Sequence, residues 1–279
     1  MLAIVGVTNA RGQEIEEIGP GDYYVRSIAK TQKATAPTYI REDDVLWETY
    51  IWRTVDLREK FNQFIYYPTE RNGLQGRKSL ANVIWDAVVA GEIPIYEDDE
   101  FKIPLDNEAY VARYTKADTI VLEIVDDQEN YEYQTVLVPK EFLSEEIYQL
   151  HLKEVWFIDK VTSRLHVRIV GLALCKDIFK NNGEEKDYIG TATLFWIPMQ
   201  SMPVRNMLVK NEAYYEDNIA QLPSWSHIFE SRMFDGFITR ETNRYNRSIS
   251  SYLTGIEAIV ESERIENELL EISEDMWEY

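Results

Sequence analysis

The sequence has little of the chemistry that supports redox, disulfide or metal sites. Its single cysteine, Cys175, stands in the apolar run RIVGLALC, and its three histidines, His151, His166 and His227, are scattered. One cysteine cannot form a disulfide within the chain, and apolar neighbours favour a buried, inert thiol. The histidines show no metal-ligand spacing and are interpreted as structural or surface residues. No cofactor and no metal are therefore expected.

Catalytic motifs are missing as well. The chain contains no G-x-S-x-G, H-E-x-x-H or G-x-G-x-x-G, the patterns that indicate a serine hydrolase, a zinc protease or a dinucleotide site. The run NGLQGRKSL ends like a phosphate-binding loop, but Arg71 stands where the motif requires its first glycine, and Arg77 separates Gly76 from Lys78. This run is interpreted as a polar loop before a helix.

Positive charge is scarce. The chain has 29 Lys and Arg against 49 Asp and Glu, for a formal net charge of −20. A phosphate backbone or an anionic membrane surface would be repelled, so nucleic acid is not expected as the main partner. Every apolar run is shorter than the roughly 18 residues that a membrane span needs. The protein is therefore not expected to cross a membrane itself.

Aromatic residues are plentiful, with 7 Trp, 18 Tyr and 10 Phe. They indicate a rigid interior, aromatic-rich interfaces, or both. Two acidic runs, YEDDE at 96–100 and VDDQEN at 125–130, offer oxygen ligands for calcium but lack its loop spacing, and they are interpreted as solvated turns. A glycan-active enzyme or carbohydrate-binding module, using paired carboxylates and exposed aromatics, is the alternative function that the composition leaves open.

Periodicity predicts an α+β fold. The runs DTIVLEIV and YEYQTVLV form one predicted β-hairpin, EVWFID and RLHVRIVGLAL form a second, and YIGTATLFWI is a further strand. The run SEEIYQLHL, opened by Ser144, is predicted to be a short helix. The expected architecture is a set of antiparallel hairpins with helices packed on one face and a C-terminal helical segment.

Two segments of the chain share the pattern of one capped helix. The runs SLANVIWDAVVAGEI, from Ser79, and SWSHIFESRMFDGFI, from Ser224, both begin with an N-cap serine and carry apolar residues at i, i+3, i+4 and i+8. Gly91 and Gly236 follow at the place where a left-handed residue ends a helix. A short extended run comes next in each copy. The pattern predicts two related helix–glycine–strand modules.

The chain divides into four parts on these patterns. Residues 1–12 resemble the end of a secretory signal peptide, although a charged n-region is missing. The remaining divisions are an extended arm at 13–42, an α+β core at 43–241 with the possible repeat at 43–110 and 190–241 and the hairpins between, and an acidic helical segment at 242–279.

Residues suited to protein contacts gather in three places. Six cations against three acids lie between Arg53 and Lys78, and RETNRYNR carries further arginines. The C-terminal segment has two offset apolar stripes; the first, which includes Ile249, is expected to pack on its own domain and the second to dock on a neighbouring chain. The predicted partner-binding residues are Arg53, Arg58, Arg77, Lys78, Arg240, Arg244, Ile265, Leu269, Ile272, Met276 and Trp277.

Five stretches carry a resemblance to a known family: DDVLWETYIWRTVDLREKFNQ, YYPTE, RKSLANVIWDAVVAGEIPIYEDDEF, LKEVWFIDKVTSRLHVRIVGLAL and SHIFESRMFDGFITRETNRYNRSISSYLTG. From 43 to the C-terminus the chain resembles the GldN/PorN family of gliding-motility and type IX secretion proteins, most specifically at 52–60. The resemblance implies an exported, non-enzymatic scaffold protein of the periplasm, without catalytic residues. It also implies self-association in a ring with an outer-membrane lipoprotein of the GldK/PorK type, at the inner face of the outer membrane, and contact with the periplasmic domain of a GldM/PorM-type motor protein.

Overall fold

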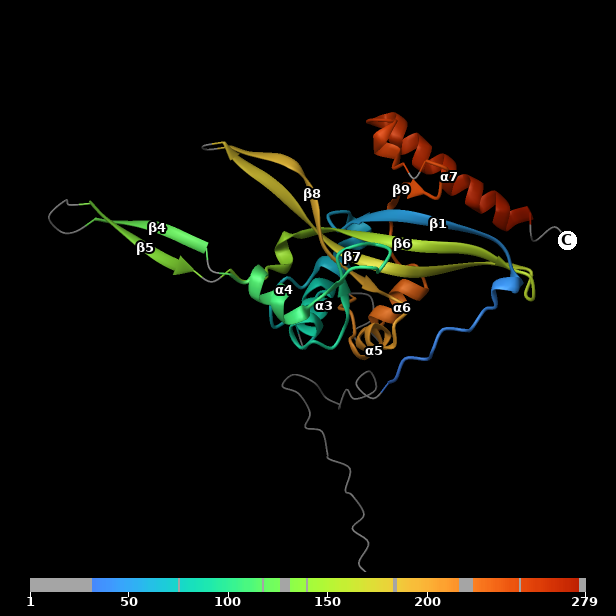
Figure 1. The fold of residues 1–279 in the computed structure, drawn as a ribbon, viewed down its shortest axis with the longest axis horizontal. Coiled ribbons are helices and arrows are strands. Elements are labelled where there is room, and N and C mark those ends of the chain that lie inside the picture. The colour runs from blue at the N-terminus through green and yellow to red at the C-terminus, as the bar shows by residue number, and fades with distance from the viewer. Residues whose placement is uncertain are drawn as a thin grey trace, which may run out of the picture.

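A seven-stranded antiparallel sheet organises the chain, with strand order β3-β2-β8-β7-β6-β1-β9 (Figure 1). The computed structural model describes residues 32–74, 76–116, 118–125, 131–138, 140–182, 185–215, 223–245 and 247–275. The strands are β1 (Val45–Asp56), β2 (Ile95–Tyr96), β3 (Pro104–Leu105), β6 (Ile147–Asp159), β7 (Arg164–Asn182), β8 (Glu185–Pro198) and β9 (Phe237–Glu241). A separate two-stranded hairpin consists of β4 (Asp118–Val125) and β5 (Tyr131–Val138).

Helices connect and cover this sheet, and the predicted α+β class is confirmed. They are α2 (Gln63–Tyr66), α3 (Leu80–Val89), α4 (Asn107–Tyr114), α5 (Met202–Lys210), α6 (Trp225–Glu230) and α7 (Ile256–Asp275). In Figure 1, helices α3 to α6 gather below the sheet, while α7 lies beyond β1 and β9, apart from the other helices. The β4–β5 hairpin and the far ends of β7 and β8 extend away from this body.

Two similar connections, each containing two α-helices, join strands on opposite sides of the central β6–β7 hairpin in the sheet. From β1 the chain passes through α2 and α3 to β2, which pairs with β8 through Tyr96 and Trp196. From β8 it passes through α5 and α6 to β9, which pairs with β1 through Arg240 and Trp52. The strand that ends each predicted helix–glycine–strand module therefore pairs with the strand that precedes the other module: β2 with β8, and β9 with β1. This arrangement favours the predicted internal repeat, which stays a proposal.

The two matching helices have the predicted starts but different ends. Ser79 and Ser224 accept hydrogen bonds from the backbone N–H three residues on, at 3.4 and 3.3 Å. Gly91 has the left-handed φ of +68° that ends α3, as expected for a glycine. The expectation for Gly236 is wrong, because α6 stops one turn earlier and Arg232, with φ +52°, takes the left-handed place. Gly236 serves close packing instead, since a Cβ there would lie 2.6 Å from the Thr54 carbonyl oxygen.

One predicted helix is also corrected. The helix expected from Ser144 is a single 3₁₀ turn, Ser144–Glu146, followed by β6. Leu150 and Leu152 of that run are buried and His151 between them is less so, which is the alternation of a strand. In the C-terminal segment, which is helical as predicted, a 3₁₀ turn at Ile249–Ser251 precedes one continuous helix, α7. Both predicted β-hairpins are present as antiparallel pairs.

The core has two parts that meet along β1. The larger apolar cluster packs α3, α5 and α6 against β6, β7 and β8, and it includes Val55 and the fully buried Trp225. The smaller cluster joins Ile51 and Ile238 to Ile265 and Leu269 of α7. Residues 51, 53 and 55 share one side of β1 because side chains alternate along a strand. Position 53, between the two clusters, is therefore inside the molecule.

The described part of the predicted arm, 32–41, is extended and lies against α5 and β7. The backbone N–H of Ala34 donates to Asn206 Oδ1 at 3.0 Å, and Arg168 donates to the Thr38 carbonyl at 2.9 Å. The predicted signal remnant at 1–12 and the acidic turn at 126–130 lie outside the described residues.

Candidate partner-binding surface

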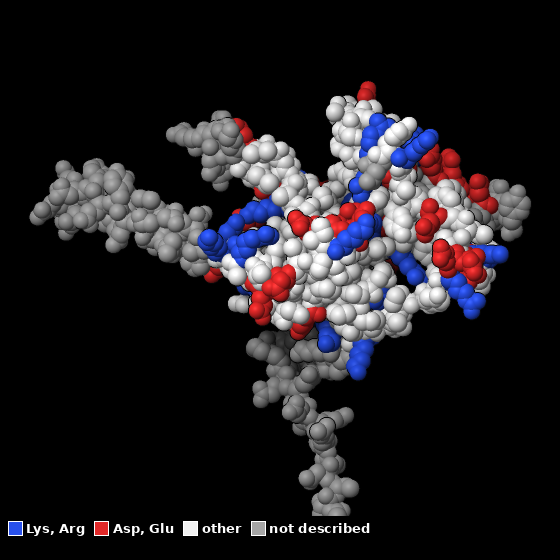
Figure 2. Space-filling model, in the orientation of Figure 1, with Lys and Arg blue, Asp and Glu red and all other residues white. Residues whose placement is uncertain are grey.

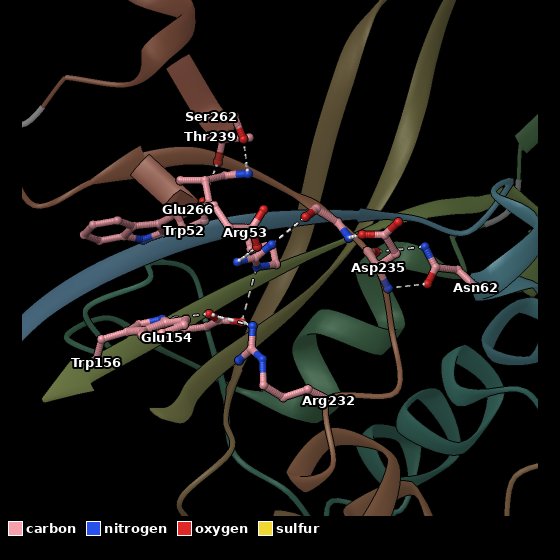
Figure 3. A network of polar contacts seen from close by, with 12 residues as sticks. Trp52, Arg53, Asn62, Glu154, Trp156, Arg232, Asp235, Thr239, Ser262 and Glu266 are labelled. Carbon is pink, nitrogen blue, oxygen red and sulfur yellow. Dashed lines mark hydrogen bonds and ion pairs between the residues drawn. The ribbon is translucent and has the colours of Figure 1, made fainter. Parts of the chain in front are cut away.

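A buried charge network lies between the two apolar clusters (Figure 3). Its acid is Glu154 on β6, which is 0 % exposed. Arg232 approaches Glu154 Oε1 at 3.0 Å, Arg53 Nε lies 3.6 Å from the same oxygen, and Trp156 Nε1 donates to Oε2 at 3.1 Å. Two guanidinium groups around one carboxylate compensate the desolvation of an ion that would otherwise be costly to bury.

Arg53 extends this network to the C-terminal helix. One of its terminal nitrogens donates to the Gly236 carbonyl at 2.5 Å and the other to Glu266 of α7 at 3.1 Å. Beside it, Asn62 and Asp235 exchange two hydrogen bonds of 2.9 Å through the Asn62 side chain and the Asp235 backbone. The network therefore ties β1, β6, the loop before β9 and α7 together.

Two arginines of the predicted basic patch, Arg53 and Arg77, are buried and not exposed as expected. Arg53 is 4 % exposed and Arg77 is 5 % exposed. Arg77 reaches Glu212 at 3.3 Å, 135 residues along the chain. Both arginines are held by acids of this same chain because the fold brings distant carboxylates to them. Neither is available to a partner in this conformation.

The other cations predicted to bind a partner lie at the surface, and Arg58 and Lys78 pair with neighbouring aspartates. Arg58, about half exposed, pairs with Asp56 at 2.5 Å, and Lys78 pairs with Asp86 at 2.7 Å. Arg244 is exposed. These residues remain candidates for contact, although surface ion pairs of this kind are weak and leave the charge accessible to a second protein.

Arg240 belongs to a stacked cluster on the opposite face of β1. Its guanidinium lies 3.5 Å from the ring centroid of Trp52 and 3.0 Å from Asp99 Oδ2. Trp52 Nε1 donates to the same oxygen at 2.8 Å, and Lys153 approaches it at 3.3 Å. Burial alone would raise the pKa of Asp99, but the Trp52 hydrogen bond and the two cations outweigh it and lower the pKa. Asp99 therefore stays ionised and holds the loop over the sheet.

The inner side of α7 differs from the predicted one. Ile265 and Leu269, expected to dock on a neighbouring chain, are 1 % and 4 % exposed and pack on Ile51 and Ile238. Ser262 is also buried here, and its hydroxyl accepts the backbone N–H of Ile238 at 2.8 Å. The helix thus covers the edge strand β9 and satisfies one of its donors.

The outer side of α7 is an exposed apolar surface. It contains Ile256 and Val260 of the stripe predicted to pack on its own domain, although Ile249 of that stripe is buried as expected. Ile256 is 79 % exposed, Ile259 is 60 % exposed and Val260 is 57 % exposed. Leu270, 52 % exposed, lies on the same side because 14 residues are close to four helical turns. Ile272 is partly buried, and Met276 and Trp277 lie outside the described residues.

Acidic side chains surround these apolar residues. Figure 2 shows them gathered along the part of α7 visible in that view. Arg264 pairs with Glu261 at 2.7 Å and also with Glu268. Within the described part of the chain, the ion pairs from α7 to a cation involve the glutamates at 261, 266 and 268, so those at 257, 263, 271 and 274 remain free.

Several residues of these networks were not singled out in the sequence. Glu154 and Arg232 are single charges in mixed segments, and their burial depends on a strand pairing and a helix packing far apart in the chain. Ser262 was passed over because counting apolar residues alone ignores a hydroxyl in a buried seam. One signal was present: Asp99 sits in the EDDE run, which was interpreted only as a solvated turn.

The arrangement offers little chemistry beyond binding. Across the described ranges, no group of three or more His, Cys, Asp or Glu side chains is placed to hold a metal ion. Each tryptophan of the described residues is buried or only partly exposed, whereas some tyrosines, among them Tyr39 and Tyr245, are well exposed. The most buried acid, Glu154, is occupied by cations.

Comparisons with known proteins identify the family. Residues 40–278 match the family described as "Gliding motility associated protein GldN", which is not a known enzyme family. A search of curated proteins finds no match. Among the described residues, no helix combines the length and apolar character needed to cross a bilayer. Because the family match covers nearly the whole chain, the protein belongs to the gliding-motility-associated GldN family.

Proposed function

We propose that this protein is a non-enzymatic structural subunit of the gliding-motility and type IX secretion machinery. In this role it assembles with an outer-membrane lipoprotein of the GldK/PorK type into a periplasmic ring at the inner face of the outer membrane. The ring couples to the periplasmic domain of a GldM/PorM-type motor protein. The observation that carries the proposal is the family match over residues 40–278.

The surface of the molecule supports a scaffold role. The outer side of α7 presents exposed aliphatic residues beside free glutamates, and Arg58, Lys78, Arg240 and Arg244 are at least partly exposed elsewhere. Exposed apolar patches bordered by charge are typical of protein–protein contact sites. The same chain thus carries surfaces of both signs, which suits contacts to several neighbours, including copies of itself.

Co-purification from envelope fractions tests the proposal. A tagged full-length chain should migrate with a lipoprotein in a megadalton-scale assembly, and should be accessible to a periplasmic labelling reagent. Loss of the chain should abolish gliding and type IX secretion together. A chain that is found throughout as a free monomer, with both activities intact in its absence, contradicts the assignment.

A further inference from the structure

We propose that the outer side of α7 is a docking site for a basic, amphipathic segment of a partner protein. The face is defined by Ile256, Ile259, Val260 and Leu270 together with the free glutamates at 257, 263, 271 and 274. This inference rests on the proposed scaffold function, and it names the surface and the chemistry of one partner.

The apolar part of the argument comes from the two sides of α7. An ordinary surface helix has one apolar stripe, which faces its own core. Here Ile265 and Leu269 already fill that role and are buried. Ile256, Ile259 and Val260, at i, i+3 and i+4, nevertheless form a second aliphatic group that is 57–79 % exposed. Such i, i+3, i+4 anchors are what a helix offers to a partner helix or groove.

Charge decides which partner fits. The free glutamates at 257, 263, 271 and 274 lie along the same helix as the exposed aliphatic residues. A partner that covers the aliphatic residues must place its own polar groups near these carboxylates, and lysines or arginines complement them. The same face of a second copy is a poorer occupant, because its own glutamates would lie against those of the first copy.

The helix is in place before any partner arrives. Its inner side is held by Leu269 and Ile265, by the hydrogen bond from the Ile238 N–H to Ser262 at 2.8 Å, and by the Arg53–Glu266 pair at 3.1 Å. A preorganised face avoids most of the ordering entropy that a free helix would lose on binding. The docking surface is therefore rigid.

A peptide-binding experiment on the full-length protein tests the proposal. The probe is a fluorescent, synthetic lysine–leucine amphipathic helix, and its counterpart has glutamate in place of each lysine. The test variant combines Ile256→Ser, Ile259→Ser and Val260→Ser, which leaves the net charge unchanged. The matched control combines Leu46→Ser, Ile103→Ser and Val161→Ser, three aliphatic residues that are 52–74 % exposed elsewhere.

The lysine probe should bind the unmodified protein, more weakly as salt is raised, while the glutamate probe should not bind. The α7 variant should bind the lysine probe about tenfold more weakly or worse, and the control should bind as the unmodified protein does. Circular dichroism must show unchanged helix content in both variants. Equal affinity for all three proteins would show only nonspecific attraction between opposite charges and would overturn the proposal.

Envelope co-purification separates this proposal from the proposed function. If the unmodified chain assembles and the α7 variant does not, both hold. If both proteins assemble equally well, the docking site is wrong while the scaffold function stands. If neither assembles, the scaffold function itself has failed. Strong self-association of the purified chain that is lost in the α7 variant would replace the basic partner with a second copy and refute the partner named here.

Discussion

Replacing Arg53 with methionine tests how the two halves of the core are joined. The change keeps an unbranched apolar stem but removes the guanidinium that contacts Glu154, the Gly236 carbonyl and Glu266. Glu154 is 0 % exposed, so it cannot recover the lost interaction from water. We therefore expect a large loss of stability, concentrated where β1 meets α7.

The magnitude follows from the contacts. Breaking a buried ion pair by removing one partner costs about 3–5 kcal/mol, and the lower end applies because Arg232 remains 3.0 Å from Glu154. Losing the bond to the Gly236 carbonyl adds about 1 kcal/mol. The pair with the half-exposed Glu266 adds only about 0–1 kcal/mol. The free energy of unfolding should fall by about 4–5 kcal/mol in total.

Urea unfolding followed by tryptophan fluorescence measures this change, because Trp52 and Trp156 lie beside the network. Arg58→Met is the matched control, since its half-exposed pair with Asp56 should contribute less than about 1 kcal/mol. Adding Glu154→Gln to Arg53→Met should cost less than the sum of the two single changes, by about 1–3 kcal/mol. A loss below about 1 kcal/mol for Arg53→Met, or strict additivity, would refute the reasoning.

Three further outcomes are expected. Ser262→Ala removes the acceptor of the buried Ile238 N–H and should cost about 1–3 kcal/mol, with amide exchange at α7 and β9 accelerating first; unchanged exchange would show that water replaces the hydroxyl. Burial lowers the pKa of His151 below its ordinary 6.5, so the unfolded state binds more protons and stability should fall as the pH drops below 6.5; a urea series in His151→Gln should show a weaker fall, and equal slopes would contradict this. Burial raises the pKa of the Cys175 thiol to about 12, so a thiol reagent at pH 8 should label it only at the rate of unfolding, and rapid labelling of the native protein would contradict its burial.

Much of the secondary structure could be predicted because its causes are local. The serine N-caps at 79 and 224 and the left-handed Gly91 act within one or two turns of their own helices. Strand alternation located both hairpins, whose partners are close in sequence. Where a second local structure was compatible with the same residues, the prediction failed: the run after Ser144 suits a short helix but pairs as β6.

The candidate site was harder to predict because it depends on pairing over long distances. Arg53 and Arg77 were predicted to lie on a basic surface, yet they are buried and pair with carboxylates 101 and 135 residues away in the sequence. Gly236 was expected to end a helix, but it is needed where the loop passes the Thr54 carbonyl. No local pattern distinguishes a solvated charge from one that a distant acid will meet.

The C-terminal helix shows most clearly which features the sequence determined and which only the tertiary structure decided. Composition and periodicity by themselves determined that the segment is helical, acidic and apolar on more than one side. Only the tertiary structure decided that Ile265 and Leu269 face inward and Ile256 and Val260 face outward. One reason is that the buried N–H of Ile238, on the edge strand β9, needs an acceptor, and Ser262 supplies it. A second is the ion pair between Arg53 and Glu266. These contacts favour the observed orientation of the helix, because rotating it to bury the other stripe would leave the Ile238 donor unpaired and separate the ion pair.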